Sequence, residues 1–372
     1  MVDQGRMFSL PSSSQLGTIL NFVYMGVFVV FLFFSQKING LLISRNVSQA
    51  LGKLKRMRDK AKEEIRTVIL EVGKPTEDPN QRLERLLQFF TIPPEGMDPA
   101  GVVQRLDHLF ETTDSRIREE IKKLAPNANE WQLMNLQNLL ETATALNTLY
   151  RVVRHYYLSS KYGGNTYSIL QVQMQLPAIM EEAEAYVSFL DAVREGKPIG
   201  DGIGALTASK LMAGQPKKEI AKEMDVAESM VEGRHVFVTK ARGPGGAVGR
   251  VGDAVKALIE ENAGKVNLVV MVDAGLKLEG EDTGEIAEGT GAAIGGIGVD
   301  QYAIECVTTK YGVPVYAIIV KESLKEVLAP MTEAITKAAD SAIARFKTVL
   351  QERTKEGDTA ILVGVGNTLR IE

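Results

Sequence analysis

The chain has 372 residues, of which 45% are hydrophobic and 24% are charged, a length and balance that predict a folded protein with room for two domains. Its net charge of -4 argues against a general nucleic-acid binder, so no nucleic-acid partner is expected. The single cysteine, Cys306, excludes an intramolecular disulfide framework and a thiolate metal cage, and none of the three histidines is spaced as a zinc-binding pair would be.

Near the amino terminus, an apolar run without charged residues predicts a transmembrane helix. The run covers 16–34, LGTILNFVYMGVFVVFLFF, and is about as long as a helix must be to cross a bilayer. A signal peptide is the competing interpretation, but the run is too long, the residues before it are not basic and no small-residue cleavage site follows. Because basic residues gather after the run, we expect a single-pass protein of the cell membrane with its carboxyl-terminal bulk in the cytoplasm.

Residues 37–75 predict a basic amphipathic stalk helix. From Ile43 to Val72, apolar residues recur in steps of mostly four and three, which gives a helix a narrow apolar seam. The seam packs either on the protein's own helical domain or on a second chain as a short parallel coiled coil. Alanines at two seam positions favour the first alternative, although a protein partner or a homo-oligomer stays open.

Residues 76–198 predict a mainly helical domain. Asp98 and Pro99 are typical of an N-cap followed by the first helical residue, and 131–158 has helical apolar spacing. Gly163 and Gly164 break that helix, and a further helix runs up to Pro177 and resumes after it. No catalytic pattern stands out in this region, which therefore has the character of an interaction or spacer module.

Residues 199–372 predict a three-layer α/β/α domain with a mainly parallel sheet. Short apolar, β-branched runs alternate here with helical patterns and glycine turns. We expect helices around 250–263, 300–311 and 330–354. The predicted strands are 235–240, 266–273, 313–321 and 359–366. Ligands of such sheets lie at the carboxyl ends of the strands, so the residues there are the candidates for function.

The first predicted strand runs into the glycine-rich sequence ARGPGGAVGR. Backbone amides around Gly243, Gly245 and Gly246 suit an anion such as a nucleotide phosphate, and Arg242 and Arg250 would add positive charge. The sequence matches neither a Walker A loop nor a dinucleotide fingerprint. Tight packing of the loop against the sheet is the alternative explanation of its glycines.

Two aspartates are the candidate catalytic residues. Asp201 stands among glycines in GDGIGALTASKL at the start of a predicted helix, where an N-cap role would explain it. Asp273 ends the predicted strand 266–273 and is therefore expected at the site face of the sheet. Further acidic residues follow in 279–288, a segment typical of a solvated loop.

The last predicted strand, ILVGVGNTLR, together with GDGIGALTASKL, resembles the opening of the hydrogenase maturation endopeptidases and the related spore germination protease. The stretches around 266–288 and 315–350 are similar to later parts of that domain, so the resemblance implies a circular permutation. It also implies that Asp201 and Asp273 share a metal-binding or catalytic site, with Asn367 on the adjacent strand end. The family's third ligand, a histidine, is missing, and the matching stretch GGIGVDQYAIE offers Asp300 instead. Carboxylates suit a hard divalent cation, or a shared proton, better than nickel.

The whole chain also resembles an archaeal family catalogued only as a domain of unknown function, number 1512, a resemblance that implies no activity. Three functions stay open from the sequence: a membrane-anchored hydrolase, for example a peptidase, that uses the two aspartates; a module that binds a nucleotide or another anionic metabolite; and a membrane scaffold without chemistry.

Overall fold

The computed structural model describes most of the chain and divides it into two compact units. One unit comprises 1–53 with 151–177, and the other comprises 54–150 with 178–372. The residues described are 13–75, 77–94, 96, 99–163, 166–262, 265–296 and 298–372, without the side chains of 13–16, 19, 32–38, 99–100 and 166. Asp98 and Gly164, for which a cap and a helix break are predicted, lie outside these residues.

The first helix, α1 (Ser13–Val68), is a single element of 56 residues that ends in a π-helical turn, Ile69–Gly73. No helix within the described ranges is both long enough and apolar enough to cross a membrane. This finding contradicts the transmembrane helix predicted for 16–34, some of whose side chains lie outside the description. The predicted run is one portion of a longer helix, which continues without a break into the charged sequence 53–66. The single-pass topology and the cell-membrane location inferred from that span are therefore wrong.

The predicted helical region is confirmed and consists of long helices. After α1 come α2 (Asn80–Leu86), α3 (Pro99–Leu124), α4 (Glu130–Gly163) and α5 (Thr166–Glu195), which continues through Pro177. In the larger unit, the seam residues Leu54, Ala61 and Ile65 of α1 are at most 2% exposed. The chain itself therefore covers this part of the seam, as the self-packing alternative predicts.

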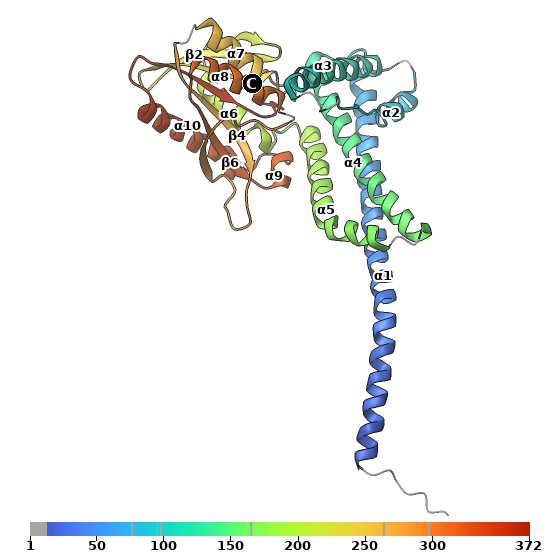
Figure 1. Ribbon diagram of the computed structural model, residues 1–372. Helices are drawn as coiled ribbons and strands as arrows, with labels where there is room; N and C mark the ends of the chain where they lie inside the picture. The colour runs from blue at the N-terminus through green and yellow to red at the C-terminus, as the bar shows by residue number, and fades with distance from the viewer. Residues whose placement is uncertain are drawn as a thin grey trace, which may run out of the picture. The chain divides into compact units, whose positions relative to one another are not determined.

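The carboxyl-terminal part is built on one sheet (Figure 1). Its seven strands have the order β1-β2-β3-β7-β4-β6-β5. The four predicted strands are confirmed and are, in chain order, β3, β4, β6 and β7. All pairs among them are parallel: β3 with β7, β7 with β4, and β4 with β6. The sheet is mixed, because β1, β2 and β5 pair antiparallel at its two sides. The strands are β1 (Lys218–Ala221), β2 (Met224–Val231), β3 (Arg234–Ala241), β4 (Val266–Leu276), β5 (Ile286–Thr290), β6 (Val315–Glu322) and β7 (Thr359–Gly364).

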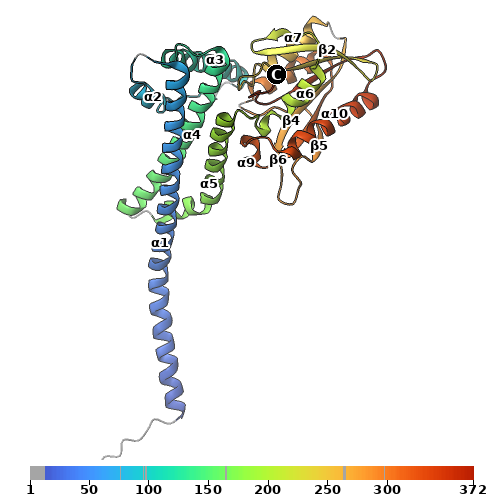
Figure 2. The ribbon, with the colours of Figure 1, turned by 180° about the vertical axis from the view of Figure 1, so that it is seen from behind.

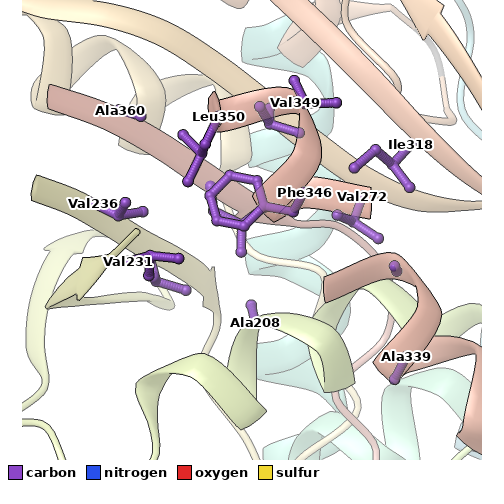
Figure 3. Packing of buried hydrophobic residues seen from close by; sticks show 14 of the residues in the cluster. Ala208, Val231, Val236, Val272, Ile318, Ala339, Phe346, Val349, Leu350 and Ala360 are labelled. Carbon is purple, nitrogen blue, oxygen red and sulfur yellow. The ribbon is translucent and has the colours of Figure 1, made fainter. Parts of the chain in front are cut away.

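Helices cover both faces of this sheet, so the predicted three layers are present (Figures 1 and 2). The helices α6 (Ile203–Met212) and α10 (Glu333–Arg353) share one apolar cluster with the sheet, in which Phe346 is fully buried (Figure 3). On the other face, α7 (Val251–Glu261) and α8 (Val299–Tyr311) share a second cluster. A short helix, α9 (Leu324–Leu328), follows β6 and has no buried residue.

Candidate acidic site

Glycines allow the start of α6 to touch the ends of the central strands. A Cβ on Gly204 would lie 2.1 Å from the carbonyl oxygen of Val272 in β4 and 2.4 Å from that of Val365, which follows β7. A Cβ on Gly202 would lie 2.6 Å from the carbonyl oxygen of Asn367. Side chains at these positions would hold the helix away from the sheet. The glycines around Asp201 are therefore required by close packing.

This packing places Asp201 beside Asp273. Asp201 lies in the 3₁₀ turn Gly200–Gly202 that leads into α6, and its Oδ2 accepts a hydrogen bond of 2.7 Å from the backbone N–H of Asn367. Asp273 lies near the carboxyl end of β4, is 9% exposed, and its Oδ1 accepts a bond of 2.8 Å from the N–H of Ala274. The negative charge of Asp201 acts on the carboxyl of Asp273, so the two predicted residues are brought together.

A third carboxyl, that of Glu322, completes the cluster. Glu322 ends β6 and is fully buried, and neither of its carboxyl oxygens has a hydrogen-bond partner. A Cβ on Gly200 would lie only 2.1 Å from Glu322 Oε2, so this carboxyl lies directly against the backbone next to Asp201. The sequence marks Glu322 as the end of a predicted strand. Its inward orientation depends on strand register, which the sequence alone did not define.

Burial makes all three carboxyls hold protons more tightly than in water. Burial, and then the charge of Asp201, raises the pKa of Asp273 to about 8. Burial, followed by the charges of Asp201, Glu326 and Asp273, raises the pKa of Glu322 to about 8. Burial also raises the pKa of Asp201, against the opposing effect of the N–H of Asn367. Since these groups interact, the cluster titrates as a unit and retains protons at neutral pH.

The cluster does not have the geometry of a metal centre. Within the part of the chain that the structure describes, no three Asp, Glu, His or Cys side chains are arranged to hold a metal ion. The divalent metal considered from the sequence therefore does not fit these residues as they stand.

Asp300, the third ligand suggested by the resemblance, lies elsewhere. It is in the first turn of α8, where its Oδ1 accepts a hydrogen bond of 2.8 Å from the N–H of Gly252. The charges that act on it are those of Arg250, Asp253 and Asp107. The structure thus gives Asp300 a position between two helix starts and does not bring it to the aspartate pair.

Asn367 joins the acidic site to the residues that follow β7. Besides the bond from its N–H to Asp201, its Oδ1 accepts a hydrogen bond of 2.9 Å from the N–H of Leu369. Asn367 is 8% exposed. These contacts hold Asn367 beside Asp201, and a role for Asn367 in binding a cofactor stays a prediction.

The glycine loop predicted to bind an anion is occupied by contacts with the protein itself. The N–H of Gly246 donates to Asn135 Oδ1 at 3.0 Å, and the Gly246 carbonyl accepts from Asn138 Nδ2 at 2.7 Å. A Cβ on Gly245 would lie 2.7 Å from Met134 Sδ, and one on Gly243 would overlap the carbonyl oxygen of Ile371. These contacts explain the glycines by close packing, mainly against α4.

The two arginines of the loop are also paired. Arg242 contacts Asp225 and Glu219 at 2.8 and 2.9 Å, and Arg250 contacts Asp107 and Asp253. An anion would have to compete with these carboxylates for the guanidinium groups. Binding of an anionic metabolite at this loop stays a prediction, and the described contacts do not favour it.

Replacing Asn135 with alanine is expected to lower the free energy of unfolding by about 1–2 kcal/mol, because the buried N–H of Gly246 would lose its acceptor. Urea denaturation followed by circular dichroism measures the change. An unchanged midpoint would contradict the docking contact between α4 and the glycine loop.

Fold and site together define an α/β domain with a buried acidic cluster at the carboxyl ends of its parallel strands, preceded by a region of long helices. The family model "Domain of unknown function (DUF1512) C-terminal" matches residues 199–372, and "Protein of unknown function (DUF1512) N-terminal domain" matches 21–196. The chain therefore belongs to the DUF1512 family. No curated protein and no solved structure gives a significant match.

Proposed function

We propose that the carboxyl-terminal domain is a hydrolase of the peptidase type, in which buried carboxyls provide both the acid and the base. The observation that carries this proposal is the convergence of Asp201, Asp273 and Glu322 at neighbouring strand ends, where burial raises the pKa of each carboxyl. Carboxyls that share protons at neutral pH are suited to general acid–base catalysis. The resemblance of the two glycine-rich segments to peptidases favours an amide substrate.

The proposed reaction needs one charged and one protonated carboxyl. Within the Asp201–Asp273 pair, the charged carboxylate removes a proton from water while the water oxygen attacks the amide carbonyl carbon. The protonated partner gives its proton to the amide nitrogen as the C–N bond breaks, and the products are an acid and an amine. Glu322 has no hydrogen-bond partner that favours its charged form, so it stays protonated and limits the negative charge of the cluster.

Substrate access requires the segment 323–331 to move. The N–H of Gly200 donates to the carbonyl of Ala329 at 3.3 Å, and that of Met331 donates to the carbonyl of Pro198 at 2.8 Å. These backbone bonds, together with the hydrogen bonds of 2.8 and 3.0 Å from Thr283 Oγ1 to the carboxylate of Glu326, hold the segment beside the acidic cluster, and α9 within it has no buried residue. Opening the segment breaks these local contacts and costs less free energy than unfolding the domain, and so the buried site and a catalytic role are compatible.

Replacing Asp201 or Asp273 with asparagine is expected to reduce peptide cleavage about 100-fold or more, because either variant lacks one of the two proton-transfer groups. The full chain would be incubated between pH 5 and pH 8 with a mixture of peptides of defined sequence, and new termini would be counted by mass spectrometry. Asp282→Asn, in the exposed loop after β4, is the matched control and should cleave like the wild type.

The proposal fails if the folded wild type cleaves no peptide across this pH range, which is the result expected of a scaffold. It also fails if both asparagine variants retain full cleavage. Circular dichroism of each variant separates a loss of chemistry from a loss of fold.

A further inference from the structure

The helical part of the larger unit contains an apolar cavity of about 430 Å³, away from the acidic cluster. All of its lining residues belong to this one unit. Its apolar walls are formed by Leu86, Phe89, Ile117, Leu140, Ala145 and Leu149. A volume of this size and mainly apolar walls are typical of sites for small organic ligands.

The charged groups of this cavity are both acidic. Its charged lining residues are two glutamates, Glu141 and Glu182, and no lysine, arginine or histidine lines it. The hydroxyl of Thr148 already donates to the carbonyl of Thr144 at 2.9 Å, which leaves its lone pairs as acceptors. A ligand that fits these walls must therefore bring hydrogen-bond donors and, for charge balance, a positive charge.

Glu141 is the group best placed to receive such a charge. Among the residues that the structure describes, Gln137 Nε2 donates to Glu141 Oε1 at 3.3 Å, which is a long hydrogen bond. Glu141 is exposed on α4, so its carboxylate is open to a ligand that enters the cavity. Glu182, in contrast, accepts a hydrogen bond from Tyr186.

We propose that this cavity binds a small amphiphilic amine, whose apolar body fills the space between α2, α3 and α4 and whose ammonium group pairs with Glu141. The proposal is independent of the hydrolase function, since the acidic cluster contributes no lining residue to the cavity.

The test compares three probes of equal chain length on the full chain at pH 7: hexylamine, 1-hexanol and hexanoate. Isothermal titration calorimetry is expected to give about tenfold or greater tighter binding of hexylamine than of hexanol, because a charge-assisted hydrogen bond is added to the same apolar contact. Hexanoate is expected not to bind, since its carboxylate would face two glutamates.

Glu141→Gln keeps the shape of the side chain and should reduce hexylamine binding to the level of hexanol. Glu181→Gln makes the same charge change at an exposed position of α5 and should leave the preference unchanged. Ala145→Phe should weaken both hexylamine and hexanol by filling the cavity. Absence of hexylamine binding to the wild type, equal affinity for the amine and the alcohol, or an unchanged preference in Glu141→Gln would each overturn the proposal.

Discussion

Replacing Glu322 with glutamine is expected to stabilise the protein at pH 9 and to flatten the loss of stability between about pH 5 and pH 8. In the folded protein the pKa of Glu322 is raised from 4.5 to about 8. A carboxyl with a raised pKa binds its proton more tightly in the folded state than in the unfolded state. The protonated Glu322 therefore contributes its full stabilisation at a pH below the pKa of the unfolded state. This stabilisation is lost as the pH rises through the pKa of the folded state.

The variant has no proton to lose, so above pH 8 it should exceed the wild type by up to about 4 kcal/mol in the free energy of unfolding. At pH 5, where the wild-type carboxyl is protonated, the two proteins should differ little. Urea denaturation at pH 5, 7 and 9 measures the effect, with Glu279→Gln in the exposed loop as the matched control. Parallel stability curves for wild type and Glu322→Gln would argue against a buried, protonated Glu322.

Replacing Gly204 with alanine is expected to lower the free energy of unfolding by about 3 kcal/mol or more. The added methyl group would meet backbone atoms of Val272 and Val365, at 2.1 and 2.4 Å, which belong to the buried centre of the sheet and cannot turn aside as a flexible side chain could. The variant should also disturb the acidic site, because α6 carries Asp201 on the turn before it.

Gly52 provides a control with the opposite sign. It also lies in a helix, α1, but a Cβ there would meet no atom within 4 Å. Gly52→Ala should therefore stabilise the protein by about 0.5–1 kcal/mol through helix propensity alone. Thermal and urea denaturation of both variants would distinguish the effects. A Gly204→Ala protein as stable as the wild type would contradict the close approach of α6 to the strands.

The inner part of the sheet was predictable from sequence because its strands are buried on both faces. Continuous apolar runs such as VNLVVMVD in β4 and TAILVG in β7 are typical of central strands. The sequences of β1 and β5, KEIA and IAEGT, are short and partly polar, and β2 alternates charged with apolar residues. Pairing with neighbouring strands stabilises these three strands more than their own hydrophobicity does, and a sequence pattern does not record that pairing.

The acidic site was predictable only in part. Asp201 and Asp273 were recognisable because one stands in a glycine-rich helix start and the other near a strand end. Glu322 follows a lysine at a strand end, and only the register of β6 determines that its side chain is fully buried. Asp300 was chosen through a resemblance in chain order, whereas the start of α8 lies against Gly252 of α7.

The transmembrane helix was predicted from the length of one apolar run. The structure places that run within the 56 residues of α1, and the described helices include none that could cross a membrane. A hydrophobic run of some twenty residues does not reveal where the helix that contains it ends. The prediction therefore rested on one apolar segment of a much longer helix.

The central position of β7 has a consequence for synthesis on the ribosome. β3 and β4 are not neighbours in the sheet, because β7 lies between them and pairs with both. A nascent chain that has emerged only as far as β6 thus holds two unfinished half-sheets, each with an open edge of unpaired backbone. Residues 359–364 form β7 and fill this gap. The core around Phe346 and the cluster of three carboxyls can therefore form only after this late segment of the domain has been translated.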